Sequence, residues 1–228
     1  MTTHIPERRI ALVAGASGLV GRALLGRLEE SGEYDRIHLL LRRPLGRQDA
    51  RVLEHLVDFD RLAGSGEAIG RVDAAFCCLG TTIRKAGSKA AFRRVDHDYA
   101  LEFGRLAAGL GARVLAVVSS LGADPESGNF YLRVKGETER DLSQIGFRSL
   151  VVLRPSLLTG DRQEFRLGER IGGAVLGVLS PLMVGTLGRV RPVAADQVAL
   201  AMAHAVREAR DGVQVLESEQ IRAACDRP

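Results

Sequence analysis

The chain has few aromatic residues and no run of like charges. Tryptophan is absent, and aromatic residues make up 4% of the 228 residues. The formal net charge is +4, with no run of five or more like charges. Surfaces that bind nucleic acid combine a basic patch with aromatic side chains on which bases stack. We therefore expect no nucleic acid among the partners and interpret the charge as a solvated basic surface.

Cysteine is also scarce. Cys77, Cys78 and Cys225 are odd in number, and an adjacent pair does not readily bridge within itself. Their spacing matches no metal-binding pattern, so we expect no metal site. Free thiols are typical of a reducing compartment, and the N-terminal residues show no signal-peptide pattern. Both observations favour a cytoplasmic protein.

No apolar run reaches the roughly 20 residues that a membrane span needs. Residues 171–185, IGGAVLGVLSPLMVG, form a shorter run that contains Pro181. Three interpretations stay open: a helix packed on the domain, which short apolar runs most often form, a subunit interface, or a membrane-surface patch. We expect a monomer or homodimer without a transmembrane segment.

Apolar runs alternate with helical patterns along the first two thirds of the chain. Strands are predicted over residues 9–15, 36–43, 72–80, 113–120 and 148–156, with a weaker one at VLEHLVDF. Helices are predicted up to Gly32, over about 90–108, and from residue 129 to about 145. Repeated strand–helix units predict an α/β fold: a Rossmann-like doubly wound parallel sheet with helices on both faces.

The alternation ends after Pro155. Residues 194–209 predict an amphipathic helix that closes the sheet, and VQVLES predicts a short late strand. We expect one NAD(P)-binding Rossmann domain over residues 1–228. Within it, residues 156–228 would contribute a small substrate-side cap and closing helices.

A glycine-rich turn joins the first strand to the first helix. GASGLVG places Gly15, Gly18 and Gly21 at the spacing of a dinucleotide-binding loop. In such loops the first glycine allows a tight turn, the second lets backbone approach a pyrophosphate, and the third lets the helix pack closely on the sheet. The amide groups that would face the anion are those of Ser17, Gly18, Leu19 and Val20.

The residues after the second strand indicate which dinucleotide would bind. An NAD site usually has an Asp or Glu there, whereas this chain has Arg42 and Arg43. Two guanidinium groups match a 2′-phosphate, so we expect NADP(H) and favour this over merely solvated arginines.

Two further strand ends belong to the predicted cofactor site. Asp58 ends the third strand, where a carboxylate would meet the adenine amino group. The fourth strand delivers Leu79, Gly80 and Thr81 to the carboxyl edge of the sheet, where ligands bind in such folds. Gly80 would leave room for the ribose.

A tyrosine and a lysine stand one helical turn apart in NFYLRVKGETE. Hydride transfer between a nicotinamide and a carbonyl needs a proton donor at the oxygen. Tyr131 would be that donor or acceptor, and Lys135 would stabilise the phenolate and bind the nicotinamide ribose. Tyr34 is expected in a loop at the opposite sheet edge and Tyr99 in the core, so neither competes for this role.

A hydroxyl at the end of the fifth strand would polarise the carbonyl. Ser119 and Ser120 both stand there, and strand alternation lets one of them point inward. The spacing to Gly122 favours Ser119.

These motifs resemble the short-chain dehydrogenase/reductase superfamily, in its atypical NAD(P)-binding branch. The likeness is to the Tat-interacting-protein family of oxidoreductase-like proteins, and it covers most of residues 8–170. It is carried by the glycine loop and by CLGTTIRKAG, FRRVDHDYA, SSLGAD, NFYLRVKGETE and LRPSLLTGDRQEFR.

The resemblance implies a cofactor site and a proton donor. NADP(H) would be held by residues 17–20, Arg42, Arg43, Leu79, Gly80, Tyr131 and Lys135, with Leu158 and Arg166 reaching the nicotinamide and phosphate ends. Tyr131 would exchange the proton. Many members of the superfamily carry Asn in the helix before the fifth strand, whereas this chain has Asp96 in that neighbourhood.

We therefore expect an NADP(H)-dependent oxidoreductase that acts on a small carbonyl or alcohol substrate. The alternative from another class is an NADP(H)-sensing binding protein with little turnover. A thiolate nucleophile at Cys77 or Cys78 is a weaker alternative, because no His lies in that segment and strand cysteines usually pack as core.

Overall fold

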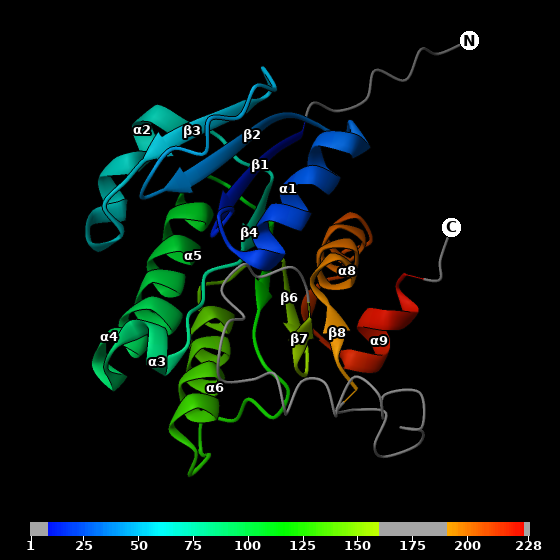
Figure 1. The fold of residues 1–228 in the computed structure, drawn as a ribbon. Helices are drawn as coiled ribbons and strands as arrows, with labels where there is room; N and C mark the ends of the chain where they lie inside the picture. Colours follow the sequence, from blue (N-terminus) through cyan, green and yellow to red (C-terminus); the bar gives the residue numbers. More distant parts are fainter. Residues whose placement is uncertain (1–8, 160–190, 226–228) are drawn as a thin grey trace.

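Seven parallel strands form the central sheet of the molecule (Figure 1). The computed structural model describes residues 9–159 and 191–225. Across the sheet the strand order is β3-β2-β1-β4-β5-β6-β9. The strands are β1 (Arg9–Ala14), β2 (Tyr34–Leu41), β3 (Val52–Leu56), β4 (Ala74–Cys77), β5 (Val114–Val118), β6 (Ser149–Arg154) and β9 (Gly212–Glu217). Because the chain reverses its direction of travel between β3 and β4, the predicted doubly wound Rossmann-like sheet is confirmed.

Helices cover both faces of this sheet (Figure 1). The main α-helices are α1 (Leu19–Ser31), α4 (Lys89–Arg93), α5 (Tyr99–Gly109), α6 (Phe130–Ser143), α8 (Ala195–Arg207) and α9 (Ser218–Ala223). On one face, α1, α8 and α9 bury a cluster that includes Leu24, Met202 and Ile221. On the other, α5 and α6 bury a cluster that includes Phe103 and Leu142.

Burial on both faces explains the continuous apolar runs in the sequence. Ala11 and Val13 of β1 face the cluster under α1 and α8, whereas Leu12 and Ala14 face the cluster under α5. All four side chains are fully buried. A strand covered on both faces needs an apolar residue at every position, so polar chemistry is confined to the strand ends.

The helical segment between β4 and β5 differs from its prediction. A single helix was expected over about 90–108, but α4 and α5 are joined by a π-helical turn, η2 (Arg94–Asp98). A π-turn inserts one residue into the helical phase, which a periodicity argument does not detect. A short helix, α3 (Ile83–Ala86), precedes α4.

The segment after β3 and the positions of two tyrosines also differ from the prediction. Residues 59–69 form a short 3₁₀ segment, η1 (Phe59–Ser65), followed by one turn of helix, α2 (Gly66–Ile69). Tyr34 is the buried first residue of β2 instead of a loop residue, and its ring packs edge-on against Phe76 at 6.1 Å between centroids. Tyr99 begins α5 half-buried, with its ring 5.6 Å from that of Phe59.

The end of the chain completes the fold. The predicted helix over 194–209 is α8, which packs beside α1, and the predicted strand VQVLES is β9 at the sheet edge. A separate parallel pair joins β7 (Leu158–Thr159) to β8 (Val193–Ala194). The substrate-side cap within residues 156–228 stays a prediction, and the run 171–185 lies outside the described residues. Over residues 9–159 and 191–225, no helix has the length and apolarity of a membrane span.

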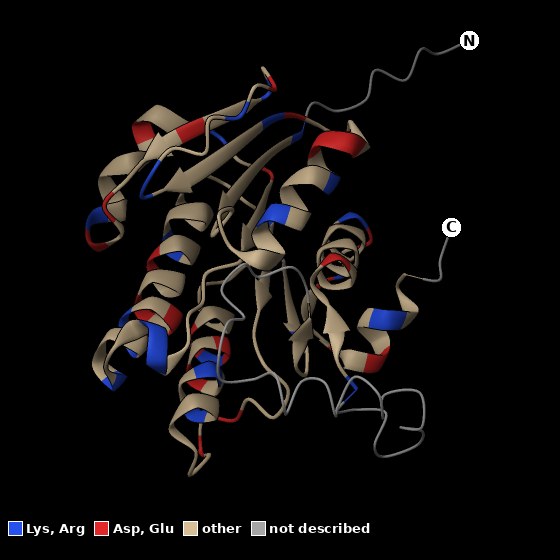
Figure 2. Ribbon diagram, viewed as in Figure 1, with Lys and Arg blue, Asp and Glu red and all other residues tan. Residues whose placement is uncertain are grey.

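Charged side chains are distributed over the outer helices and loops (Figure 2). In this view Lys and Arg are interspersed with Asp and Glu along α5 and α6. Several form local ion pairs, such as Arg105 with Glu102 at 2.6 Å and Arg148 with Asp211 at 2.6 Å. The basic excess is therefore not gathered on one helix of this face.

Candidate active site

The loop after β1 is built from backbone packed on backbone. Gly15 has a φ of +84°, and a Cβ there would lie 2.4 Å from the carbonyl oxygen of Cys78. A Cβ on Gly21 would lie 2.1 Å from the carbonyl oxygen of Gly15. The N–H of Gly18 donates to that same Gly15 oxygen at 2.9 Å. Glycine at these positions therefore lets the loop after β1, the loop after β4 and the start of α1 meet at the point where the sheet reverses.

The first turn of α1 is open to an anion. Gly18 is its N-terminal cap, no side chain caps the free N–H groups, and no acidic residue lies in the first turn. Uncapped N–H groups and the helix dipole together favour a negatively charged ligand. Ser17 and Gly18 are exposed, so a ligand can approach them.

Arg42 and Arg43 follow the end of β2, the strand next to β1. Both are exposed, and neither forms an ion pair or hydrogen bond with any described residue. Other arginines of the following loop are occupied, since Arg47 pairs with Glu29 and Arg51 with Asp49. Two guanidinium groups without a partner in the described part of the chain thus stand beside the end of β2.

Asp58 lies two residues beyond the end of the third strand instead of at its end, because β3 ends at Leu56. Its Oδ1 accepts the backbone N–H of Asp60 at 3.0 Å and caps η1. The predicted contact with an adenine amino group stays a prediction, and Oδ2 is the carboxylate oxygen that this cap does not use.

The loop after β4 lies against Lys135. A Cβ on Gly80 would be 3.8 Å from Lys135 Nζ and 3.5 Å from Asp96 Oδ1. The N–H of Thr81 donates to Asp96 Oδ2 at 2.8 Å. Leu79 is half-buried against the cluster under α5. The structure therefore brings the predicted ribose loop and the predicted lysine together, although they are more than 50 residues apart in sequence.

Tyr131 and Lys135 lie in the first turns of α6. The side chain of Asn129 caps this helix by accepting the N–H of Tyr131 at 2.9 Å. The Tyr131 ring is half-buried and packs against Phe92 of α4, with 5.4 Å between ring centroids. Lys135 is 6% exposed, and its Nζ lies 2.8 Å from Asp96 Oδ1.

The charge on Lys135 depends on its neighbours. Burial alone would lower the pKa of Lys135, because an apolar surrounding disfavours the ammonium. The Asp96 carboxylate opposes burial, with a smaller contribution from Tyr131, and the net effect is a pKa above the ordinary lysine value. The amine is therefore held as a cation next to the phenol.

The Ser119 hydroxyl is already engaged. It donates to Glu139 in a short hydrogen bond, and Arg154 binds the same carboxylate through Nε at 3.0 Å and Nη2 at 2.5 Å. Glu139 lies eight residues after Tyr131, about 12 Å along the α6 axis. This contact does not favour the predicted carbonyl-polarising role of Ser119. Within residues 9–159 and 191–225, the hydroxyl of half-buried Ser120 makes a single long contact, 3.4 Å to the carbonyl oxygen of Leu121.

Neither Cys77, the last residue of β4, nor Cys78, just after it, is in a setting that favours a thiolate. Burial raises the pKa of Cys77 to about 11 and raises the pKa of Cys78 as well. Cys78 instead packs its sulfur 3.8 Å from that of Met202. The thiolate alternative therefore gains no support. No cluster of three or more metal-ligating side chains occurs among residues 9–159 and 191–225.

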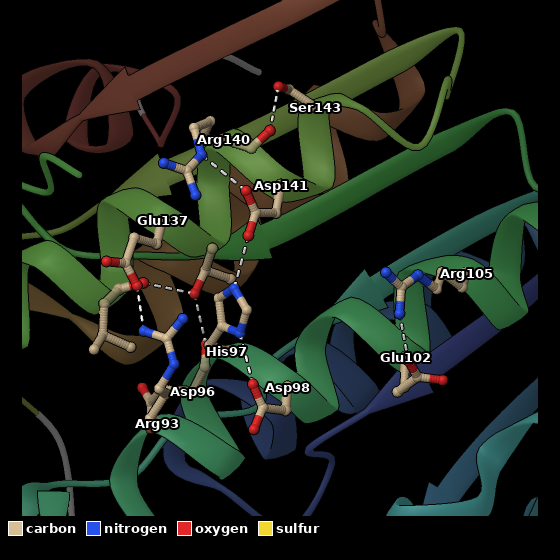
Figure 3. A network of polar contacts seen from close by, with 12 residues as sticks. Arg93, Asp96, His97, Asp98, Glu102, Arg105, Glu137, Arg140, Asp141 and Ser143 are labelled. Carbon is tan, nitrogen blue, oxygen red and sulfur yellow. Dashed lines mark hydrogen bonds and ion pairs between the residues drawn. The ribbon is translucent and has the colours of Figure 1, made fainter. Parts of the chain in front are cut away.

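A ladder of polar contacts joins the segment α4–η2 to α6 (Figure 3). Arg93 pairs with Glu137, and His97 lies between Asp98 at 2.7 Å and Asp141 at 2.9 Å. His97 is buried. This ladder fixes the helix that carries Tyr131 and Lys135.

The remaining predicted site residues lie near the end of the sheet or outside the described chain. Leu158 is the half-buried first residue of β7, just after the end of β6. Arg166 lies outside the described residues. The sequence interpretation missed Phe92, Glu139 and Arg154. Glu139 was recognisable, because its spacing of four from Lys135 places both on one face of the helix.

Solved structures share the fold at low sequence identity. No family model matches the chain. MoeE5, solved in complex with UDP-glucuronic acid and NAD, has a TM-score of 0.68 over 90% of this chain and 75% of that protein, at 19% identity. Human epimerase family protein SDR39U1, solved with NADPH, has a TM-score of 0.58 over 91% of this chain and 74% of that protein, at 20% identity. These likenesses establish the fold alone.

Two curated relatives are closer in sequence. HTATIP2 of Rattus norvegicus is 38% identical over 176 residues, which are 76% of this chain and 72% of that protein. FMP52 of Eremothecium gossypii is 34% identical over 217 residues, which are 92% of this chain and 95% of that protein.

These names also correct one expectation. The FMP52 relatives of Eremothecium gossypii, Saccharomyces cerevisiae and Debaryomyces hansenii are named as mitochondrial, so the prediction of a cytoplasmic location is wrong. Free cysteines indicate a reducing compartment, and this property does not distinguish the cytoplasm from other reducing compartments. The identity to HTATIP2 and FMP52 settles the family: the chain is a member of their group of atypical short-chain dehydrogenase/reductases.

Proposed function

We propose that the chain is an NADP(H)-dependent oxidoreductase that interconverts a small carbonyl compound and its alcohol. The observation that carries this proposal is the buried Lys135 ammonium, which lies beside Tyr131 and against the loop at Gly80. A surface that only bound a nucleotide would have no need of a buried cation held next to a phenol.

The cofactor would be bound at the sheet reversal. Its pyrophosphate would meet the uncapped N–H groups at the start of α1, and the 2′-phosphate would meet Arg42 and Arg43. Support for the phosphate comes from the two arginines, which are exposed and have no partner among the described residues. When bound, the reduced nicotinamide supplies the hydride to the carbonyl carbon.

The proton chemistry would belong to three side chains of this protein. Tyr131 would donate its hydroxyl proton to the carbonyl oxygen, and Lys135 would stabilise the phenolate that remains. Lys135 would also donate to a ribose hydroxyl. Ser120 would hydrogen-bond the carbonyl oxygen, because the hydroxyl of Ser119 is donated to Glu139.

Cofactor choice is tested by fluorescence titration with NADPH and NADH. We expect the wild type to prefer NADPH, and Arg42→Ala and Arg43→Ala each to weaken NADPH about tenfold or more while leaving NADH unchanged. Arg47→Ala is the matched control, since Arg47 is paired with Glu29 and should leave both affinities unchanged. Equal affinity of the wild type for both cofactors would contradict the role of the two arginines.

Turnover is tested with a panel of small aldehydes and ketones. Tyr131→Phe should keep NADPH affinity and lower kcat by about 10²–10⁴-fold, the usual contribution of general acid catalysis. Ser120→Ala should lower kcat more than Ser119→Ala does. If the wild type binds NADPH but reduces no carbonyl of the panel, the nucleotide-sensing alternative gains instead.

A further inference from the structure

Asp96 connects two parts of the candidate active site that are distant in sequence. It lies in the π-turn η2, and its side chain is buried, with 2% of the residue exposed. One carboxylate oxygen, Oδ1, is 2.8 Å from Lys135 Nζ, and the other, Oδ2, accepts the backbone N–H of Thr81 at 2.8 Å. A single carboxylate thus holds both the lysine of α6 and the loop after β4.

The contact between the two helical segments has a matched spacing. Phe92 and Asp96 stand four residues apart on α4–η2, and they face Tyr131 and Lys135, four residues apart on α6. Phe92 packs on the Tyr131 ring, while Asp96 pairs with Lys135. The hydroxyl of Thr138 lies 3.0 Å from the carbonyl oxygen of Asp96 and adds a contact between the backbone of η2 and α6.

The surroundings of Lys135 leave Asp96 as its counter-charge. The titratable groups that act on the ammonium are Asp96 from η2, Tyr131 from α6 and Cys77 from β4. A phenol and a thiol are uncharged in their ordinary protonated forms, so the carboxylate is the anion of this set. A buried ammonium without such a partner is strongly disfavoured. Asn, which many members of the superfamily carry in this neighbourhood, has the shape of Asp but not its charge.

We propose that Asp96 is a positioning residue of the active site, which fixes the Lys135 ammonium and the loop at Gly80 and Thr81 in one arrangement before the cofactor arrives. The role of Asp96 in catalysis rests on the proposed function. Its effect on the charge of Lys135 does not, because that effect is present in the protein without cofactor. Asp96 acts through Lys135 and the loop and has no direct contact with substrate in this role.

The lysine content of the chain makes the coupling directly measurable. Among its 32 Lys and Arg residues, the chain has three lysines: Lys85, Lys89 and Lys135. Lys85 and Lys89 are exposed and serve as internal references. NMR of the protein with an isotope label at lysine Cε therefore gives three resonances, each of which can be followed as the pH rises.

The test compares the wild type with Asp96→Asn and with Asp141→Asn. Asp141 makes the control because its carboxylate belongs to the same helix contact but binds His97. In the wild type, Lys135 should lose its proton above the two reference lysines. In Asp96→Asn, its titration should fall below theirs by about 2.5 pH units or more, since burial then acts with no carboxylate to oppose it. In Asp141→Asn it should not move.

NADPH affinity gives the second measurement. Asp96→Asn should bind NADPH within about threefold of the wild type near pH 6.5, but about tenfold more weakly near pH 9, where its Lys135 has lost the proton. A purely structural role would weaken binding equally at every pH. An unchanged Lys135 titration in Asp96→Asn, or a loss of affinity that does not vary with pH, would overturn the proposal.

Failure of the proposed function and poor folding of the variant can each be distinguished from failure of the Asp96–Lys135 pairing. If neither the wild type nor the variants bind NADPH, the proposed function fails, whereas the NMR titration of the ligand-free protein still decides the coupling. If Asp96→Asn folds poorly, the double variant Asp96→Asn/Lys135→Met, which removes both charges, should regain thermal stability, while Asp96→Asn/Lys89→Met should not. Equal behaviour of the two double variants would refute the pairing.

Discussion

Substituting Gly21 by Ala tests the backbone packing on which the cofactor loop depends. The new Cβ would lie 2.1 Å from Gly15 O, 2.8 Å from Gly15 C and 2.9 Å from Ala16 Cα, all of them backbone atoms, whereas ordinary contacts begin at 3.4 Å. The loop and α1 must therefore separate by about 1 Å, and no flexible side chain can absorb the change. Overpacking of this kind costs about 1–3 kcal/mol, which exceeds the gain of about 1 kcal/mol from replacing glycine in a helix.

Gly26 provides the matched control on the same helix. A Cβ at Gly26 would meet no atom within 4 Å. Gly26→Ala should therefore stabilise the protein by about 0.5–1 kcal/mol, since it removes only the excess freedom of glycine. The gain from removing glycine is common to both variants, so they should differ by the overpacking cost of about 1–3 kcal/mol in free energy of unfolding, or about 2–12 °C in Tm for a domain of this size.

Thermal unfolding and NADPH titration are the two assays. Gly21→Ala should also lose NADPH affinity by at least about tenfold, because the N–H groups at the start of α1 move with the loop. Gly26→Ala should bind NADPH like the wild type. Equal Tm values for the two variants would refute the packing argument, and undiminished NADPH binding by a destabilised Gly21→Ala would refute the cofactor assignment of the loop.

Two other predictions concern buried titratable groups. Cys77 and Cys78 should resist iodoacetamide near pH 8 in the folded protein, since burial raises the pKa of Cys77 to about 11 and that of Cys78 also; mass spectrometry showing either labelled before unfolding would contradict this. His38 is 2% exposed with Nδ1 2.8 Å from Nε2 of His55, and burial, then His55 and Arg36, lower its pKa to about 4. The unfolded chain binds this proton at a higher pH than the folded protein does. The free energy of unfolding should therefore fall by about 2–3 kcal/mol as the pH drops from about 6.5 to about 4. His38→Leu should flatten that loss in urea unfolding measured across this range, and an unchanged pH dependence would count against the burial argument.

The sheet was predictable because its strands are buried on both faces. A strand such as β1, with every side chain covered, reads as a continuous apolar run that ends in glycine. The Tyr131–Lys135 pair was predictable for a similar reason, since spacing of four on one helix fixes which side chains share a face. Local patterns of this kind need no knowledge of the tertiary structure.

The contacts that organise the site were beyond such patterns. Asp96 meets Lys135 only because the π-turn at residues 94–98 sets the helical phase, and nothing in the composition of that segment indicates the turn. Likewise, spacing favoured Ser119 over Ser120, whereas the hydrogen bond of Ser119 to Glu139, which Arg154 also binds, is a long-range contact that spacing does not indicate. The choice between the two hydroxyls stays a prediction.

The glycine loop after β1 and the arginines after β2 are constrained differently, and this difference has an evolutionary consequence. At Gly15 and Gly21 the backbone packs directly on backbone, so almost any substitution there disturbs folding and ligand binding together. Arg42 and Arg43 support no neighbour within the described chain, so exchanging them would leave the free energy of unfolding nearly untouched. Under the proposed function, preference between phosphorylated and unphosphorylated dinucleotides would therefore be a trait that this scaffold loses or regains by one or two surface mutations, without first acquiring a compensating change in its interior.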